Sequence, residues 1–281
     1  MSATVVNGNQ IAAEILADLK ARVAVLKESG RAVSLAVVLV GSNAASSVYV
    51  RNKGLAAEII GVDFKLFVYP SEISTTELVN EIKKIQGENQ LDGLIIQLPL
   101  PKTVDSKEVI NQIAPEIDVD GLTAVSAAKL VVGEQQFLPP TPAAILEILK
   151  YHQVDLKNKK VVMIGKGELV GKPLAAILTN QKVDLIACDR STPDISVFTR
   201  EADVIITGAG SPGLLTGEMI KPGAVVLDAG FGSVDGKSCG DIDFPSVAAK
   251  ASLVTPTPGG VGPVTVAKLL ANTVKVAENR S

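Results

Sequence analysis

The chain has 281 residues, enough for two domains at about 150 residues each, and its 47% hydrophobic and 20% charged residues are typical of a globular protein. A net charge of −3, 3% aromatic residues and the absence of Trp argue against nucleic-acid binding, which needs cations for phosphates and rings for bases. The longest uncharged stretch, 32–50, is interrupted by glycine and polar residues, and the first residues lack a signal-peptide pattern. We therefore expect neither a nucleic acid nor a membrane as a partner.

Cysteine and histidine are scarce. Cys188 and Cys239 lie 51 positions apart with no C-x-x-C pair, which favours a reducing compartment, the cytoplasm by default, over a disulfide framework or a thiolate metal site. His152 is the only histidine, so a metal site with two histidines is excluded. We interpret His152 as the C-terminal residue of a helix. An enzyme with this composition is expected to work without a metal and to move protons with another side chain.

In the first half of the chain, helical patterns alternate with short apolar runs. The expected elements are a helix at 10–27 ended by Gly30, a strand at 33–40, a helix at 44–61, a strand at 63–69, a helix at 75–86 and a strand at 93–98. Strands separated by helices predict a parallel sheet covered on its faces. The fold class is therefore α/β.

A second series begins after the prolines at 139, 140 and 142. It contains an expected strand at 160–165, a helix at 170–180, strands at 183–188, 203–207 and 224–228, a loop at 255–263 and a final helix from Val266 to Val276. This half is typical of a Rossmann-type nucleotide-binding sheet. We expect one domain at 1–120 and 264–281, to which the final helix returns, and a dinucleotide-binding domain at 121–263.

A glycine loop, Gly165-Lys166-Gly167 followed by Gly171, joins the strand at 160–165 to the next helix. Glycines there allow a tight turn and a close approach of a pyrophosphate to the helix N-terminus, although a plain turn between strand and helix is the alternative. Asp189 follows the next strand, where a carboxylate can accept a hydrogen bond from a ribose 2′-hydroxyl. The alternative is that Asp189 only caps a turn and pairs with Arg190.

Lys53 is the most informative lysine. On a helix at 44–61 it projects away from Arg51 and Glu58, and Tyr49 lies one turn before it. Partly apolar surroundings would lower the pKa of Lys53 towards a range useful for proton transfer. The alternative is a lysine whose stem covers apolar surface while its ammonium group reaches water.

Two further polar positions follow strands or turns. Gln97 lies at the carboxyl end of a strand, the edge at which open α/β sheets bind ligands, or it is simply an amide facing a loop. Asp118 and Asp120 precede Gly121 and a helical pattern, where helix capping or a turn is the alternative to a functional site. Two carboxylates could bind a metal, but this segment lacks the further oxygen ligands of a calcium loop.

Several motifs resemble those of one enzyme family. They are, in chain order, Gly41 with Ala45-Ser46, Tyr49-Val50-x-x-Lys53, Asp92-Gly93-Leu-Ile-Ile-Gln97-Leu-Pro-Leu-Pro101, Asp118-Val-Asp120-Gly121, Pro139-x-Thr141-Pro142, Val170-Gly171-Lys-Pro173, Lys221-Pro-Gly223, Gly240-Asp241-Ile-Asp243 and Pro258-Gly-Gly-Val-Gly-Pro263. In order and spacing the chain resembles the bifunctional methylenetetrahydrofolate dehydrogenase/methenyltetrahydrofolate cyclohydrolase family from about residue 40 to residue 270.

The resemblance implies a homodimer of two-domain chains with the folate site between the domains of each chain. It implies NAD(P)-dependent oxidation of 5,10-methylenetetrahydrofolate and hydrolysis of the product to 10-formyltetrahydrofolate, a one-carbon donor for purine biosynthesis. By the same resemblance, Lys53 is the catalytic lysine and Gln97 the glutamine that tunes it. Tyr49 lies against the folate, and Asp120 anchors the pterin.

The resemblance also implies two sets of binding residues. The folate is expected to contact Pro258, Gly259 and Gly260 in addition to Tyr49 and Asp120. The dinucleotide is expected to contact Gly165, Lys166, Gly167, Gly171, Asp189, Arg190, Gly208, Gly262 and Thr265.

The chain departs from the family pattern mainly on the dinucleotide side. Lys166-Gly167 replaces an Arg-Ser pair, and Asp189-Arg190 follows Cys188 where the family has His-Ser. The carboxylate would repel a 2′-phosphate, which predicts a shift from NADP towards NAD, although Arg190 and Lys166 remain close enough to meet a phosphate. A cyclohydrolase with weak or lost dehydrogenase activity and a non-catalytic folate- or nucleotide-binding regulator are the alternative functions.

Overall fold

The computed structural model describes residues 3–234 and 237–280, which form two compact units. The three-strand unit consists of residues 13–129, 135–140 and 266–280. The six-strand unit consists of residues 3–12, 130–134, 141–234 and 237–265. Among the residues described, no helix is long and apolar enough to cross a membrane.

The three-strand unit is built on a parallel sheet in the order β3-β2-β4. Its elements are the greater part of α1 (Gly8–Glu28), β2 (Ser34–Val40), α2 (Ala44–Ile60), β3 (Asp63–Tyr69), α3 (Thr75–Glu88), β4 (Gly93–Ile96), α4 (Ser106–Ile110), the 3-10 turn η1 (Pro115–Ile117) and the first part of α5 (Ala124–Val132). Every residue of the central strand β2 is buried, which explains its unbroken apolar sequence. The strands and helices expected in this half are confirmed, except that β4 ends at Ile96 and leaves Gln97 beyond it.

Helix α2 carries the candidate lysine, and both of its ends are fixed locally. The Asn43 side chain accepts a hydrogen bond from the Ser46 backbone N–H at 3.0 Å and caps the start. Gly61 ends the helix with φ of 83°, a left-handed conformation that residues with a side chain rarely adopt. These caps fix the residues at which the helix begins and ends.

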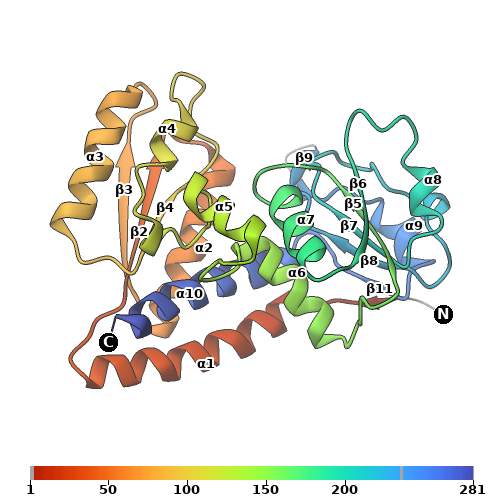
Figure 1. The fold of residues 1–281 in the computed structure, drawn as a ribbon, viewed down its shortest axis with the longest axis horizontal. Coiled ribbons are helices and arrows are strands. Elements are labelled where there is room, and N and C mark those ends of the chain that lie inside the picture. The colour runs from red at the N-terminus through yellow and green to blue at the C-terminus, as the bar shows by residue number, and fades with distance from the viewer. Residues whose placement is uncertain (1–2, 235–236, 281) are drawn as a thin grey trace. The chain divides into compact units, whose positions relative to one another are not determined.

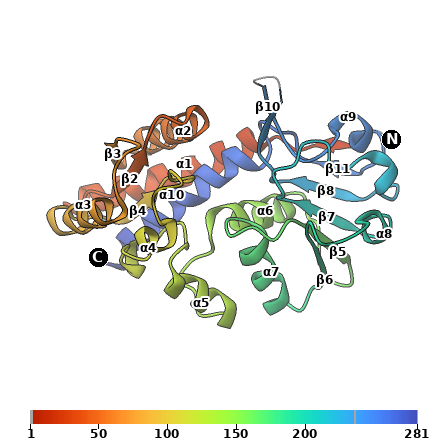
Figure 2. The same ribbon diagram turned by 90° about the horizontal axis from the view of Figure 1, so that it is seen from above.

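The C-terminal helix α10 (Val261–Asn279) packs on the three-strand unit from residue 266 onward. Leu270 and Val274 are fully buried in the core of that unit, and Asn272 donates to the carbonyls of Val119 and Leu138, both at 2.9 Å. Arg22 of α1 binds Glu278 of α10, and the two helices run side by side (Figure 1, Figure 2). The expected return of this helix is confirmed, but it begins at Val261, inside the expected loop.

The six-strand unit holds a parallel sheet in the order β1-β11-β8-β7-β5-β6. Its elements are β1 (Thr4–Val5), α6 (Pro140–Tyr151), β5 (Lys160–Ile164), α7 (Gly171–Asn180), β6 (Asp184–Cys188), α8 (Ser196–Thr199), β7 (Val204–Thr207), the 3-10 turn η2 (Gly217–Met219), β8 (Val225–Asp228), the β9 (Gly232–Val234) and β10 (Lys237–Cys239) pair, α9 (Phe244–Ala248) and β11 (Leu253–Val254). Helix α7 connects β5 to β6, and Figure 2 shows it beside these two strands. The Rossmann-type α/β fold is confirmed.

Four segments of the chain lie in a different unit from the one expected. Residues 3–12 belong to the six-strand unit because Thr4 and Val5 pair with β11, and residues 264–265 also belong to it. Residues 121–129 and 135–140 belong to the three-strand unit. A two-residue strand is too short to show a periodicity, so neither β1 nor β11 could be predicted.

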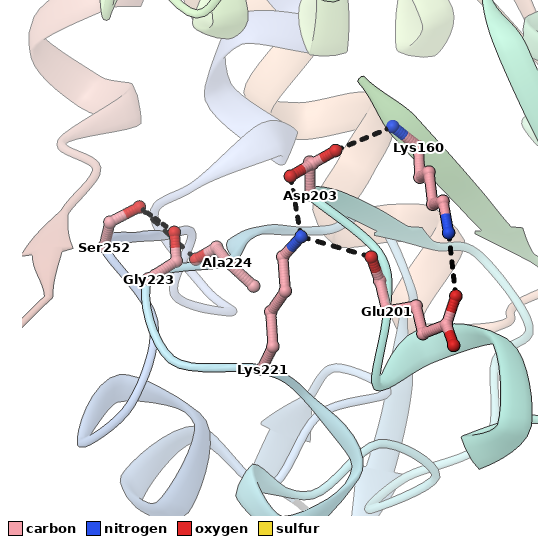
Figure 3. A network of polar contacts seen from close by, with 7 residues as sticks. All are labelled: Lys160, Glu201, Asp203, Lys221, Gly223, Ala224 and Ser252. Carbon is pink, nitrogen blue, oxygen red and sulfur yellow. Dashed lines mark hydrogen bonds and ion pairs between the residues drawn. The ribbon is translucent and has the colours of Figure 1, made fainter. Parts of the chain in front are cut away.

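A polar network ties together the amino ends of the strands in the six-strand unit (Figure 3). Lys221 donates to the carboxylate of Asp203 at 2.7 Å and to the carbonyl of Glu201 at 3.1 Å. The backbone N–H of Lys160, at the start of β5, donates to the other oxygen of Asp203 at 2.8 Å. The network lies at the edge of the sheet opposite to the glycine loop.

Candidate active site

Lys53 lies in the three-strand unit with its ammonium group directed at Gln97. The Lys53 Nζ donates to the Gln97 Oε1 at 3.0 Å. The Gln97 Nε2 donates to the Leu98 carbonyl at 2.9 Å, which leaves the amide oxygen facing the lysine. Because β4 has ended at Ile96, the side chain of Gln97 is free to turn back towards α2.

Burial lowers the pKa of the Lys53 ammonium group, because a low-dielectric site disfavours the charge, while the negative charge of Asp120 acts in the opposite direction. Burial also raises the pKa of Asp120, and this effect is partly offset by the charge of Lys53. Tyr49, one turn before Lys53, is partly buried, which raises the pKa of its phenol. Lys53, Gln97 and Asp120 thus form one coupled cluster within the three-strand unit.

Asp118 and Asp120 have different surroundings although they are two residues apart. The fully buried carboxylate of Asp118 accepts hydrogen bonds from the backbone N–H groups of Leu122 at 3.2 Å and Thr123 at 2.9 Å. Gly121 completes the turn with φ of 70°. Turn formation and capping therefore explain Asp118, whereas Asp120 is left to interact with Lys53.

Metal-ligating side chains do not gather in the part of the chain that the structure describes. Over residues 3–234 and 237–280 there is no group of three or more His, Cys, Asp or Glu side chains placed to hold a metal ion. His152 follows the last residue of α6, as expected, and its ring meets the Tyr151 ring edge-on at 5.3 Å between centroids.

The glycine loop of the six-strand unit is tight and open on one side. A Cβ on Gly171 would overlap the carbonyl of Gly165, and a Cβ on Gly165 would lie 2.5 Å from the carbonyl oxygen of Gly208. A Cβ on Gly167 would meet no atom within 4 Å. Helix α7 begins with no side-chain cap, so its N-terminus faces the loop as a site for an anion. These features fit the pyrophosphate of a dinucleotide.

Asp189 pairs with Lys166 and not with Arg190, which is exposed. Lys166 Nζ lies 3.0 Å from Asp189 Oδ2, while Asp189 Oδ1 accepts from the Ser191 backbone N–H at 2.9 Å and from its hydroxyl. Hydrogen bonds from Ser191 and Lys166 lower the pKa of Asp189 to about 2, so the carboxylate is charged at any physiological pH. It lies beyond the end of β6, close to the glycine loop, because Gly165 N–H donates to the Cys188 carbonyl.

The remaining expected contacts all lie in the six-strand unit. Gly260 is buried against Gly8, on which a Cβ would overlap the Gly260 carbonyl, while Pro258 is exposed and Gly259 accepts from the Gly8 N–H at 2.9 Å. Gly262 is exposed in the first turn of α10, and Thr265 donates to the Val261 carbonyl at 3.1 Å.

Three polar residues with extensive contacts were not expected to have a role: Asp228, Asp241 and Asn272. Asp241 lies in the Gly240-Asp241-Ile-Asp243 motif, which was the only sequence signal available for it.

The six-strand unit has a parallel sheet with a glycine loop at its carboxyl edge, and the other unit has a lysine with a lowered pKa. These features are those of a dinucleotide-dependent oxidoreductase that also has a proton-transfer site. Comparison with known proteins narrows this class. Residues 6–120 match the model of the tetrahydrofolate dehydrogenase/cyclohydrolase catalytic domain, and residues 139–281 match that of the NAD(P)-binding domain. The chain belongs to the tetrahydrofolate dehydrogenase/cyclohydrolase family.

Relatives match the chain from end to end. A bifunctional protein FolD of Exiguobacterium sibiricum is 42% identical over 276 residues, which cover 98% of this chain and 100% of the relative. The crystal structure of FolD from Campylobacter jejuni superposes with a TM-score of 0.96 at 38% identity and 100% coverage of both chains. The structure of the Trypanosoma brucei enzyme, solved with NADP and an inhibitor, superposes with a TM-score of 0.95 at 33% identity. The match covers 100% of this chain and 99% of the Trypanosoma brucei chain.

Proposed function

We propose that this family member oxidises 5,10-methylenetetrahydrofolate with NAD(P) and hydrolyses the resulting methenyl compound to 10-formyltetrahydrofolate, with Lys53 as the proton-transfer group. The observation that carries the assignment of Lys53 is its 3.0 Å hydrogen bond to Gln97 in surroundings that lower its pKa. Membership of the tetrahydrofolate dehydrogenase/cyclohydrolase family supplies the two reactions.

Hydrolysis needs a group that both accepts and returns a proton. The uncharged amine of Lys53 accepts a proton from the water molecule that attacks the methenyl carbon. When the bond between that carbon and one folate nitrogen breaks, the ammonium group returns the proton to the departing nitrogen, and the hydroxyl group on the carbon loses its proton to solvent as the formyl C=O bond forms. The lowered pKa of Lys53 increases the fraction of uncharged amine near neutral pH, and Gln97 fixes the direction of the Nζ.

Asp120 and Tyr49 supply recognition. The carboxylate of Asp120 accepts hydrogen bonds from N–H groups of the pterin, and its charge interacts with Lys53. The partly buried ring of Tyr49 offers the flat amphipathic surface that a pterin or its aminobenzoyl group can contact. Pro258, Gly259 and Gly260 remain proposed folate contacts on the resemblance alone.

The oxidation step depends on residues of the six-strand unit. A bound dinucleotide supplies the hydride acceptor. The residues of this chain that would hold it are Gly165, Gly167 and Gly171, with the uncapped N-terminus of α7 facing the pyrophosphate. The open, glycine-lined loop argues against the alternative of a cyclohydrolase with weak or lost dehydrogenase activity. The lowered pKa of Lys53 argues against a non-catalytic regulator.

We further propose that NAD is preferred to NADP. Asp189 is ionised, lies at the end of β6 and already neutralises Lys166, so neither side chain is available to hold a 2′-phosphate. The same carboxylate can accept a hydrogen bond from a ribose 2′-hydroxyl.

We also propose a cytoplasmic homodimer that contributes to purine biosynthesis. The two cysteines are unpaired, as in proteins of a reducing compartment. One face of α2 exposes Val48, Leu55 and Ile59, and the adjoining edge strand β3 exposes Leu66 and Val68. An exposed apolar stripe beside an edge strand is typical of a surface that pairs with a second copy.

The central test is Lys53→Met, which keeps the length of the side chain and removes the titratable amine. Cyclohydrolase kcat is expected to fall by about 10²- to 10⁴-fold, with the far-ultraviolet circular dichroism spectrum unchanged. Arg51→Met is the matched control because Arg51 lies on the same helix and is exposed. Unchanged hydrolysis of the methenyl substrate by Lys53→Met would refute the role of Lys53.

A further inference from the structure

Two buried carboxylates of the six-strand unit have no part in the proposed chemistry. Asp228, the last residue of β8, is 2% exposed, and Asp241 is 0% exposed. Charges so deeply buried are unfavourable unless hydrogen bonds compensate them. Among residues 3–234 and 237–280, neither carboxylate has an ion pair with a lysine, arginine or histidine, so backbone N–H groups provide most of the compensation.

Asp241 binds the loop that follows β7. Its Oδ2 accepts a hydrogen bond from the Ala209 N–H, and its Oδ1 accepts one from the Ser211 N–H, both at 2.6 Å. The carboxyl group of Asp241 therefore satisfies two nearby backbone donors of one short segment, residues 208–211, and fixes the path of that segment.

Asp228 in turn holds the backbone of Asp241. Its Oδ1 accepts from the Asp241 N–H at 3.1 Å and from the Thr207 hydroxyl at 2.8 Å, and its Oδ2 accepts from the Ile242 N–H at 3.3 Å. A Cβ on Gly240 would overlap the Asp228 carboxylate, so only glycine allows this approach. The two carboxylates thus link β8, residues 240–242 and the loop after β7.

The loop at 208–211 borders the place where a dinucleotide binds. After β5 the chain passes through α7 to β6 on one side, and β7 then lies on the other side of β5. In open parallel sheets ligands bind at such a switch point, outside the carboxyl ends of the strands. Gly208 also touches the glycine loop, because a Cβ on Gly165 would lie 2.5 Å from the Gly208 carbonyl oxygen.

We propose that Asp241, held in place by Asp228, is a positioning residue that fixes the loop at 208–211 as one wall of the dinucleotide crevice. The inference rests on the proposed dinucleotide-dependent function and adds a residue that the reaction itself does not use. Without this acceptor, the N–H groups of Ala209 and Ser211 lose their partner and the loop leaves its position. Dinucleotide binding is then weakened, whereas hydrolysis, which depends on Lys53, is not.

The test is Asp241→Asn, which preserves the size of the side chain but replaces one acceptor oxygen with an N–H donor. We expect the dissociation constants of NAD and NADP, measured by calorimetry, to rise about tenfold. We also expect the amides of Ala209 and Ser211 to exchange hydrogen faster in the dinucleotide-free protein. The kcat and KM of the cyclohydrolase step should remain as in the unmodified protein.

Asp243→Asn is the matched control, because Asp243 belongs to the same motif but is exposed and makes no capping hydrogen bond through its side chain. If Asp241→Asn does not fold, Thr207→Val provides a milder variant that removes one hydrogen-bond donor to Asp228. For this variant we expect a smaller rise in the dissociation constants of NAD and NADP, faster exchange of the same amides and unchanged cyclohydrolase kinetics.

Faster hydrogen exchange of the Ala209 and Ser211 amides in Asp241→Asn with unchanged dinucleotide affinity would overturn the proposal. A parallel loss of cyclohydrolase activity and dinucleotide binding would also overturn it. If the unmodified protein binds neither dinucleotide, the proposed oxidation itself is wrong, and the exchange measurement still reports whether Asp241 holds the loop.

Discussion

At the scale of single residues, Lys53 has its pKa lowered by burial and not by a cationic neighbour. The negative charge of Asp120 acts against the shift. Gln97 accepts a hydrogen bond from the Lys53 Nζ, which orients this nitrogen without adding a charge. Burial therefore favours the uncharged amine of Lys53, the form that accepts a proton.

Substitutions of Gln97 should move the pH dependence of hydrolysis in opposite directions. In Gln97→Glu a carboxylate replaces the amide and raises the pKa of Lys53, so the rise in activity with increasing pH shifts to higher pH. In Gln97→Ala the ammonium form loses an acceptor, so the rise shifts to lower pH while kcat falls about tenfold. The measurement is the pH profile of cyclohydrolase kcat and kcat/KM. A change in KM alone for Gln97→Ala would contradict an orienting role.

Asp189→Ser tests dinucleotide preference at one residue. The unmodified protein is expected to have the higher kcat/KM with NAD. Removing the carboxylate frees Lys166 and abolishes the repulsion of a 2′-phosphate, so the ratio should move towards NADP by about tenfold or more. Asp184→Ser, at the opposite end of β6, is the control. A preference for NADP that Asp189→Ser leaves unaltered would show that this carboxylate does not read the ribose.

At the scale of elements, the parallel sheet of the six-strand unit divides its polar groups between two edges. The carboxyl edge holds the glycine loop and Asp189, whereas the amino edge holds Lys221, Asp203 and Glu201 in contacts that serve stability (Figure 3). Lys221 lowers the pKa of Asp203, which shows that their interaction favours the ionised carboxylate.

Lys221→Met should therefore lower the free energy of unfolding by about 1 kcal/mol near neutral pH, since the pair is only partly exposed. The folded-state pKa of Asp203 lies below its ordinary value of 3.8, so this contribution is present above pH 3.8 and is lost as the pH falls through the lowered value. Urea unfolding at two pH values measures it. Lys160→Met is the control, because its more exposed pair with Glu201 should contribute close to nothing. Equal effects of the two variants would contradict the assignment.

At the scale of the whole molecule, the proposed homodimer makes a prediction about charge on an apolar face. The double variant Ile59→Lys with Val68→Lys places two cations on the exposed stripe of α2 and β3. Burying them against a second copy would be unfavourable, so we expect monomers in sedimentation velocity where the unmodified protein is a dimer. Val25→Lys is the control, because Val25 is exposed on α1. A double variant that remains dimeric would place the interface elsewhere.

The sequence by itself determined the fold class, most of the strands and helices, and the candidate Lys53, Gln97 and Asp120. Local patterns carry this information: β2 is buried along its length and is therefore continuously apolar, and the glycines at 165 and 171 mark a turn that side chains would block. Capping signals such as that of Asp118 also act over a few residues.

Only the tertiary structure decided which side chains contact residues that are distant in the sequence. Asp189 pairs with Lys166, Gln97 turns its oxygen to Lys53 from 44 positions away, and Asp241 reaches a loop 30 to 32 positions earlier. The sequence could not predict that β1 joins the six-strand unit, because the pairing of two short strands depends on the order in which the whole sheet assembles. Hydrogen bonds between distant residues depend on strand order and on where each strand ends, and neither has a periodic signature along the chain.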